Sequence, residues 1–159
     1  MTKEMQNAHH NAAGTQATRL RKPHDSLSIA LLRARETVMT QFRPMLAKHD
    51  VSEQQWRVIR LLHENGTLDA TDVAKRTFIL APSLTRIIRT LEEKQVLSRQ
   101  KDGNDGRRML LKLEPKGEAI IQEILPDHTR IYDQLEQHFG KEWVSDLLQR
   151  LDQLITHQA

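Results

Sequence analysis

The sequence comprises 159 residues with 24 basic side chains, 21 acidic side chains and no cysteine. A chain of this length favours one domain and can bury a core that needs neither a disulfide nor a metal ion. The lack of cysteine excludes a disulfide framework and a thiol redox sensor. No apolar run reaches membrane-spanning length and the polar N-terminus lacks a signal-peptide core, so we expect a cytoplasmic protein with no membrane partner.

Positive charge is concentrated in one segment of the chain. Residues 75–108 hold nine basic and four acidic side chains, a net charge of +5, whereas the rest of the chain sums to −2. A basic segment in an otherwise nearly balanced chain indicates a face that binds a polyanion such as DNA.

The N-terminal part predicts a tail followed by a long helix. Residues 1–22 show no sustained apolar periodicity, so we expect a mostly disordered tail with a basic end. Apolar residues then recur at helical spacing over about 26–48. Pro44 should bend or interrupt this helix, because proline removes a backbone donor.

Two shorter helices are expected next. Ser52 and Gln55 have the spacing of a capping box, which predicts a helix that runs to about residue 64 and stops at Asn65-Gly66. A third helix is expected over about 69–76.

The fourth predicted helix begins near residues 81–83, runs to about residue 95 and has two distinct faces. Its apolar residues recur at i, i+4, i+7, i+8 and i+11 and are Leu80, Leu84, Ile87, Ile88 and Leu91. The other face offers hydroxyls and guanidinium groups, which suit a DNA major groove, where arginine pairs with guanine and threonine meets a thymine methyl. The candidate DNA contacts on it are therefore Ser83, Thr85, Arg86 and Arg89.

A β-hairpin is predicted after this helix. Residues 96–101 and 108–113 have strand character and are joined by the turn sequence DGNDGR. Three short helices followed by a hairpin is the element order of a winged helix-turn-helix. Asn104, Arg107 and Arg108 on the narrow hairpin are candidates to reach phosphates or a minor groove.

The C-terminal part predicts two further helices. One begins at Pro115 and runs to about residue 139 with a kink at Pro126, and the other follows Gly140. They carry too many apolar positions for a solvated pair of helices. We therefore expect a single domain over 23–159, mainly α with a small β-hairpin. Its DNA-binding lobe would be 52–113, and the flanking helices at 26–48 and 115–157 would form the dimerisation region of a homodimer.

One segment resembles a known family. The sequence PSLTRIIRTLEEKQVLSRQKDGNDGRRMLLKLEPKG, residues 82–117, resembles the recognition helix and wing of the MarR family. Its most specific part is Asp102-x-x-Asp105-x-Arg107, followed by an apolar strand and Gly117. The resemblance covers about residues 26–157 and implies that the wing arginine enters the minor groove while the wing aspartate braces basic side chains. The chain departs from the family pattern at two helix ends, with Gln95 in place of a usual glycine and Glu114 in place of a usual threonine.

Further segments resemble one subgroup of that family. HDSLSIALLRAR (24–35), FRPML (42–46) and VSEQQWRVIRLL (51–62) are similar to repressors of aromatic-acid catabolism, such as the homoprotocatechuate and hydroxycinnamate operon repressors. The resemblance implies an aromatic effector, such as a hydroxycinnamate or a dihydroxybenzoate, held between the dimer helices and the DNA-binding lobe. The implied lining is Trp56, Arg60 and Tyr132 from one subunit and His24, Ser26 and Ser28 from the other.

The residues themselves support a carboxylate site near Arg60. Trp56 and Arg60 are spaced i, i+4 and project from one helix face. Arg60 is flanked in sequence by apolar residues, so we expect it to need an anion, which a ligand carboxylate held bidentately would supply. Arg43 is a second candidate partner for that carboxylate.

These residues also have plainer interpretations. Trp56 could be core, Arg60 could close a structural ion pair with a residue such as Glu53, Tyr132 could be an interface aromatic, and the arginines at 86 and 89 could be a solvated face. The eight histidines show no metal-ligand spacing, so we expect neither a metal ion nor a cofactor.

The hypothesis is a homodimeric repressor of an aromatic-acid catabolic operon. It would bind a pseudo-palindromic operator and be released by an aromatic acid or its coenzyme A thioester. One alternative is an architectural DNA-binding protein without a ligand, which an ion pair at Arg60 would favour. Another is a hydrolase of small aromatic esters, for which the sequence supplies no catalytic group.

Overall fold

The computed structural model describes residues 26–103, 105 and 108–157. The predicted tail and the candidates His24, Asn104 and Arg107 therefore lie outside the described residues. The chain divides into two compact units, residues 1–35 and residues 36–159. The buried hydrophobic core of the described residues belongs to the second unit.

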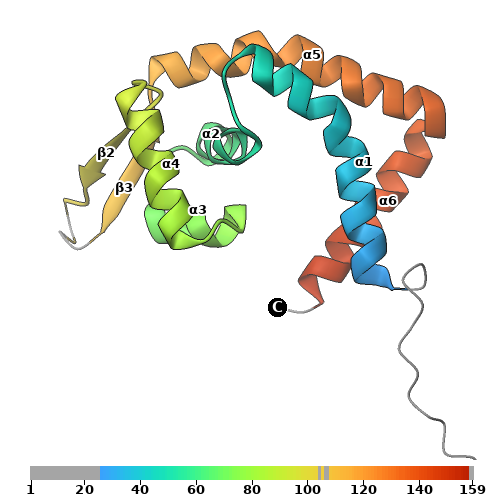
Figure 1. Ribbon diagram of the computed structural model, residues 1–159. Helices are drawn as coiled ribbons and strands as arrows, with labels where there is room; N and C mark the ends of the chain where they lie inside the picture. Colours follow the sequence, from blue (N-terminus) through green and yellow to red (C-terminus); the bar gives the residue numbers. More distant parts are fainter. Residues whose placement is uncertain (1–25, 104, 106–107, 158–159) are drawn as a thin grey trace, which may run out of the picture. The chain divides into compact units, whose positions relative to one another are not determined.

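The described residues are mainly helical, with one small sheet (Figure 1). The elements in chain order are α1 (Leu27–Lys48), α2 (Glu53–Asn65), β1 (Leu68–Asp69), α3 (Ala70–Thr77), α4 (Ala81–Glu93), β2 (Leu97–Lys101), β3 (Met109–Leu113), α5 (Pro115–Phe139) and α6 (Lys141–Thr156). The predicted winged helix-turn-helix order, three short helices followed by a hairpin, is confirmed.

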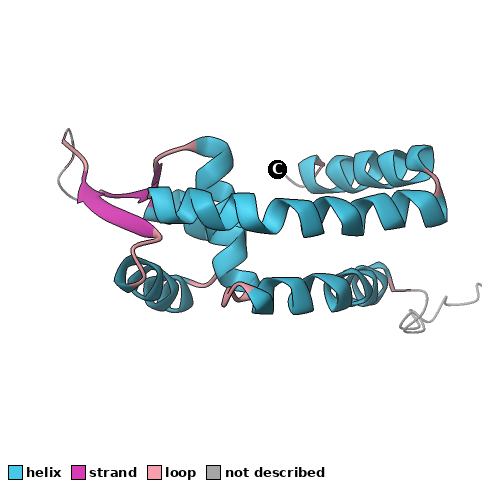
Figure 2. Ribbon diagram, turned by 90° about the horizontal axis from the view of Figure 1, so that it is seen from above, coloured by secondary structure: helices cyan, strands magenta, loops and turns pink. Residues whose placement is uncertain are grey.

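Local signals place most helix ends correctly. Gln55 N–H donates to Ser52 Oγ at 3.2 Å and Ser52 N–H donates to Gln55 Oε1 at 2.8 Å, which is the predicted capping box. Pro44 and Pro126 both lie inside helices that continue past them, so neither proline ends its helix. Figure 2 shows α5 as one continuous helix with α6 beside it.

The sheet contains one strand more than the sequence indicates. The strand order is β1-β3-β2, and both pairings are antiparallel. The hairpin pairs Leu97 with Leu113 at one end and Lys101 with Met109 at the other. β1 has only two residues, too few to show the alternation by which a strand is recognised in a sequence.

α4 is fixed by one apolar face. Leu84, Ile87, Ile88 and Leu91 are buried at the spacing that the sequence predicts. Leu80 is not part of this face: it precedes the helix, and 79% of it is exposed. The apolar stripe therefore begins one turn later than predicted, because the chain is still extended at Leu80.

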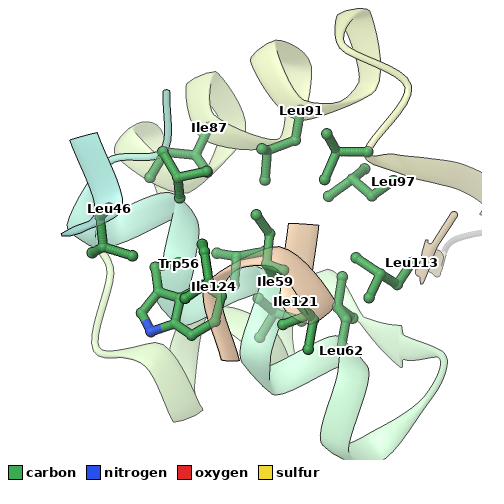
Figure 3. Packing of buried hydrophobic residues seen from close by; sticks show 14 of the residues in the cluster. Leu46, Trp56, Ile59, Leu62, Ile87, Leu91, Leu97, Leu113, Ile121 and Ile124 are labelled. Atoms are coloured by element: carbon green, nitrogen blue, oxygen red, sulfur yellow. The ribbon is translucent and has the colours of Figure 1, made fainter. Parts of the chain in front are cut away.

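The core joins α4 to α2, α5 and the hairpin. Figure 3 shows Ile87 and Leu91 of α4 on one side of the core and Ile59 and Leu62 of α2 on the other. Ile124 of α5 is also fully buried in this cluster. Side chains from four segments of the chain thus share one core, which determines which face of α4 points outward.

Both departures from the family pattern lie at helix ends. Gln95, just after α4, has φ +61°, a left-handed conformation that suits glycine better than glutamine. Glu114 precedes α5 without capping it through its side chain, and instead its Oε1 accepts a hydrogen bond from Ser98 Oγ at 2.5 Å. The chain therefore keeps the fold with a strained turn at one position and a substitute contact at the other.

Gly117 allows α5 to approach the hairpin closely. A Cβ atom at this position would lie 2.4 Å from Leu113 Cδ1 and 2.6 Å from the Val96 carbonyl oxygen. We predict that Gly117→Ala lowers the free energy of unfolding by about 1–3 kcal/mol, because overpacking displaces neighbouring atoms.

The matched control for this prediction is Gly103→Ala, because a Cβ atom at Gly103 meets no atom within 4 Å. Urea unfolding of both variants should show a loss for Gly117→Ala and a change within about 0.5 kcal/mol for the control. Equal stability of the two variants would contradict the close packing at Gly117.

Candidate functional site

The outward side of α4 carries the residues expected to contact DNA. Arg86 and Arg89 are exposed, whereas Ser83 is partly buried. Arg89 Nε donates to Glu93 Oε1 at 2.9 Å, an exposed pair one turn apart. Arg86 forms no ion pair with any described residue, so its guanidinium remains available to a partner.

Thr85 also lies on this side of α4. Its Oγ1 donates to the Ala81 carbonyl oxygen at 2.9 Å, so its hydroxyl hydrogen is used within the helix. The oxygen can still accept a hydrogen bond and the methyl group can still make an apolar contact. Thr85 is therefore better suited to meet a thymine methyl or a donor than an acceptor.

Asp69 links the start of α3 to the wing. Its Oδ1 accepts hydrogen bonds from the backbone N–H groups of Thr71 at 2.7 Å and Asp72 at 3.2 Å, while its Oδ2 accepts one from Arg108 Nε at 2.8 Å. The hydrogen bond from Arg108, supported by the backbone donors, lowers the pKa of Asp69 to about 2. One carboxylate thus caps a helix and anchors a hairpin.

Arg108 has a protein partner. It immediately precedes β3 at the turn end of the hairpin, where its carbonyl oxygen accepts a hydrogen bond from Asp102 N–H at 3.0 Å. Its guanidinium is held by Asp69, which raises the pKa of Arg108. Arg108 therefore lies beside the turn, as expected, but its guanidinium is paired with Asp69 of β1, and its contact with DNA stays a prediction.

A cavity of about 190 Å³ lies between α2 and α5. Its lining residues are Trp56, Arg60, His63, Glu64, Ile121, Gln122, Leu125 and His128. Apolar side chains and ionisable side chains meet in it, the combination that suits a small aromatic molecule with one charged group.

Arg60 has a protein partner. Its Nε and Nη2 donate to Glu64 Oε1 at 3.0 and 2.8 Å, and 44% of its side chain is exposed. The expectation that Arg60 sits in an apolar setting and lacks an anion is therefore wrong. Its apolar neighbours in sequence, such as Ile59 and Leu62, point into the core from the opposite face of the helix. The ion pair is the feature that favours an architectural protein without a ligand.

His128 was missed by sequence reasoning, although it lines the cavity together with Trp56 and Arg60. Its ring centroid lies 4.9 Å from that of Tyr132 and 5.5 Å from that of Phe42. Burial, with a smaller contribution from the nearby Arg60 charge, lowers the pKa of His128, so its imidazole is uncharged at neutral pH. The i, i+4 spacing of His128 and Tyr132 is the signal in the sequence that could have placed His128 here.

The remaining predicted ligand contacts are placed less directly. Tyr132 is not among the lining residues and reaches the cavity wall only through its ring contact with His128. Arg43 does not line the cavity either, because its Nη2 pairs with Glu36 at 2.7 Å and its Nε with Glu53 at 3.4 Å.

The predicted ligand contacts Ser26 and Ser28 belong to the first unit, where their Oγ atoms lie 3.0 Å apart.

The helices outside the DNA-binding lobe expose large apolar side chains. No residue of α6 is buried, although Trp143, Leu147 and Leu148 lie on it, and the rings of Phe139 and Trp143 stack at 4.7 Å. The first unit likewise exposes apolar residues of α1, among them Leu27. Exposed apolar helix faces of this kind indicate a protein interface.

Two further observations concern only the described residues. No three histidine, cysteine, aspartate or glutamate side chains come together there as ligands for a metal ion. Within the same ranges, every helix is too short or too polar to cross a lipid bilayer.

The chain is similar in sequence and structure to transcriptional regulators. The profile of the MarR family matches residues 51–109. The chain is 47% identical over 131 residues to the HTH-type transcriptional regulator FarR of Neisseria gonorrhoeae, and the matched region spans 80% of this chain and 90% of that protein. It is 39% identical over 132 residues to the homoprotocatechuate degradative operon repressor of Escherichia coli, spanning 83% of this chain and 89% of that protein. The structure of NadR in complex with 4-hydroxyphenylacetate is similar with a TM-score of 0.77 at 44% identity, covering 86% of this chain and 96% of that chain.

The contact between Asp69 and Arg108 predicts an acid-dependent stability. The folded pKa of Asp69 is about 2 against an ordinary value of 3.8, so its contribution is complete above pH 3.8 and is lost as the pH falls towards 2. We predict that Asp69→Ala lowers the melting temperature at pH 7, and that its difference from wild type shrinks over this acid range.

The control for this prediction is Asp69→Asn, which keeps an oxygen that can cap α3 but deletes the charge. Thermal unfolding followed by circular dichroism from pH 7 to pH 2 should place its melting temperature between those of wild type and Asp69→Ala. A wild-type-to-Ala difference that does not change with pH would show that the carboxylate charge contributes nothing.

Proposed function

The chain belongs to the MarR family of DNA-binding transcriptional regulators, and from this premise we propose a dimeric repressor that a small aromatic acid releases from its operator. The family and the relatives are regulators of transcription and not enzymes, so the hydrolase alternative is set aside. The operon for aromatic-acid degradation and the nature of the acid are the parts of the proposal that need testing.

DNA binding is assigned to α4 and the wing. In the proposal, α4 enters the major groove with Ser83, Thr85, Arg86 and Arg89, while the wing residues Asn104 and Arg107 reach the flanking backbone or minor groove. A homodimer formed through the helices at 26–48 and 115–157 would set two copies of α4 about one helical turn apart on a pseudo-palindrome. The exposed apolar side chains of α1 and α6 support this dimerisation region.

The observation that carries the ligand proposal is the cavity shared by Trp56, Arg60 and His128. Both Arg60 donors meet a single oxygen of Glu64, and an exposed pair of this kind contributes little to stability. A ligand carboxylate would offer two oxygens to the same guanidinium, which is the stronger bidentate arrangement. The indole of Trp56 and the uncharged imidazole of His128 would then flank the aromatic ring.

The position of the cavity explains how a ligand could alter DNA binding. α2 belongs to the DNA-binding lobe and α5 to the proposed dimerisation region, and both line the cavity. A ligand that contacts both helices favours the conformations in which they close on it. If those conformations set the two lobes at a spacing that does not match successive grooves, operator affinity falls.

The ion pair between Arg60 and Glu64 supports a second candidate function, an architectural DNA-binding protein without a ligand. Under that candidate, no hydroxylated benzoate, cinnamate or phenylacetate should raise the melting temperature or weaken DNA binding. A thermal-shift screen with these acids and their coenzyme A thioesters separates the two candidates.

Arg86→Ala tests the DNA-binding face. It should weaken specific DNA binding by about 1–3 kcal/mol, because it removes a charged donor from the groove. The fold should be unaffected, since Arg86 is exposed. Arg150→Ala is the control, because Arg150 lies on α6, away from α4 (Figure 1). Fluorescence anisotropy with a duplex selected by the wild-type protein measures both variants, and equal affinity would exclude this orientation of α4.

Opposite substitutions in one ion pair test the ligand site. Arg60→Gln should lower the affinity for the aromatic acid by about 1.5–3 kcal/mol, since a charge-assisted pair becomes at most a neutral hydrogen bond. Glu64→Gln should raise that affinity by up to about fivefold, because it removes the competing carboxylate. Isothermal titration with the acid that gives the largest thermal shift measures both.

The control for this pair is Arg150→Gln, which breaks the comparable pair between Arg150 and Asp146. It should leave ligand affinity unchanged, and operator affinity without ligand should stay close to wild type in all three variants. If neither Arg60→Gln nor Glu64→Gln changes the ligand affinity, the ion pair has a purely structural role.

A further inference from the structure

Two large apolar side chains are exposed immediately before α4. Phe78 is 86% exposed and Leu80 is 79% exposed, the two highest values among the large hydrophobic residues described. Ile79 between them is buried in the core. The connection from α3 to α4 therefore anchors its middle residue and presents the residues on both sides to the surroundings.

Phe78 occupies a backbone position that disfavours it. Its φ is +53° and its ψ +37°, the left-handed conformation in which glycine commonly ends a helix. The conformation is required here: Phe78 N–H donates to the Ala74 carbonyl oxygen, and the chain then turns so that Ile79 reaches the core. A bulky residue in this region is an outlier, so the phenylalanine side chain brings a local cost without contributing to the core.

Leu80 is also a poor residue for its position. It is the N-cap of α4, where a serine, threonine, aspartate or asparagine side chain would accept a backbone hydrogen bond, and leucine forms none. Phe78 in its left-handed conformation and Leu80 at the N-cap are thus both exposed apolar residues at positions that disfavour them. Residues that break local rules without a gain in packing commonly serve binding.

Exposed basic side chains flank this pair in the sequence, which favours DNA as its binding partner. Lys75 and Arg76 in the last turn of α3 are exposed before it, and Arg86 is exposed on α4 after it. The pair thus continues the basic face that α4 offers to DNA. The major groove presents one apolar group, the C5-methyl of thymine, and large apolar side chains recognise it by contact.

We propose that Phe78 and Leu80 contact thymine methyl groups at the edge of each operator half-site. The inference rests on the proposed role of α4 in the major groove. It adds an apolar element to recognition by arginine and threonine. It also predicts that the protein distinguishes thymine from uracil, which pairs identically but lacks the methyl group.

The test uses variants that should favour the fold while removing the contact. Phe78→Asn places a residue that tolerates the left-handed conformation, and Leu80→Ser supplies a helix cap. The matched control is Gln95→Asn, which makes the same kind of exchange at the exposed left-handed position after α4. All three should unfold at the wild-type temperature or above it.

DNA binding is measured on a duplex that the wild-type protein selects from a random library, with each thymine replaced in turn by uracil. Loss of the contacted methyl should weaken wild-type binding by about fourfold per half-site, the factor expected for one buried methyl group. Phe78→Asn should bind the thymine duplex with a similar loss and show no further loss with uracil at that position. Gln95→Asn should behave as wild type with both duplexes.

The outcomes separate this inference from the proposed function. Suppose that Phe78→Asn and Leu80→Ser both keep the DNA affinity and the uracil sensitivity of the wild type, while Arg86→Ala loses DNA affinity. This result would overturn the inference and leave the role of α4 intact. If all of these variants, including Arg86→Ala, bind as wild type, both fail. A shift of Phe78→Asn from dimer to monomer in sedimentation would show that a second copy of the chain covers the pair, which also overturns the inference.

Discussion

The rotation of α4 about its own axis is the constraint on which the DNA-binding lobe depends. Leu84, Ile87, Ile88 and Leu91 lie on one face and are buried against α2 and the hairpin. An interior packed at crystal-like density admits one rotation of such a helix, because any other would expose these side chains and bury charges. The outward position of Arg86 is thus a consequence of packing on the opposite face.

The wing depends on a different kind of interaction. A two-stranded hairpin buries few side chains and is marginally stable alone, so its orientation needs additional contacts. Leu111 of β3 is fully buried, and the carboxylate of Asp69 holds Arg108 at the turn end of the hairpin. Because Asp69 also caps α3, the direction of the wing is tied to the helix pair that positions α4. Core and surface contacts thereby orient helix and wing together.

The ionisable side chains Arg60, His63 and His128 line the cavity between α2 and α5. Arg60 and His63 are each paired with an acid, Glu64 and Glu118, and these pairs are partly exposed. For Arg60, such a pair avoids the cost of an unsatisfied charge, yet an exposed pair is weak enough to exchange. His128 meets the same requirement differently, since burial keeps its ring uncharged. The proposed ligand site would therefore be stable without a ligand and could still receive an acid.

Local patterns in the sequence determined the helices, the hairpin and their order, but not the two-residue strand β1. Apolar periodicity predicted the helices, Ser52 and Gln55 predicted a cap, and the turn sequence after β2 predicted the hairpin, because each of these signals acts within a few residues. Trp56 and Arg60 were also placed on one helix face correctly. Their role as ligand contacts remains a prediction, as do the base contacts of α4.

Only the tertiary structure decided which side chains meet across the chain. It tied Arg108 to Asp69 through a two-residue strand, and it brought His128 into the cavity beside Trp56. It also exposed Leu80, which the periodic pattern had assigned to the core. Periodicity reports which face of an element is apolar, but the partners on that face depend on how distant elements pack, and packing is a property of the whole core.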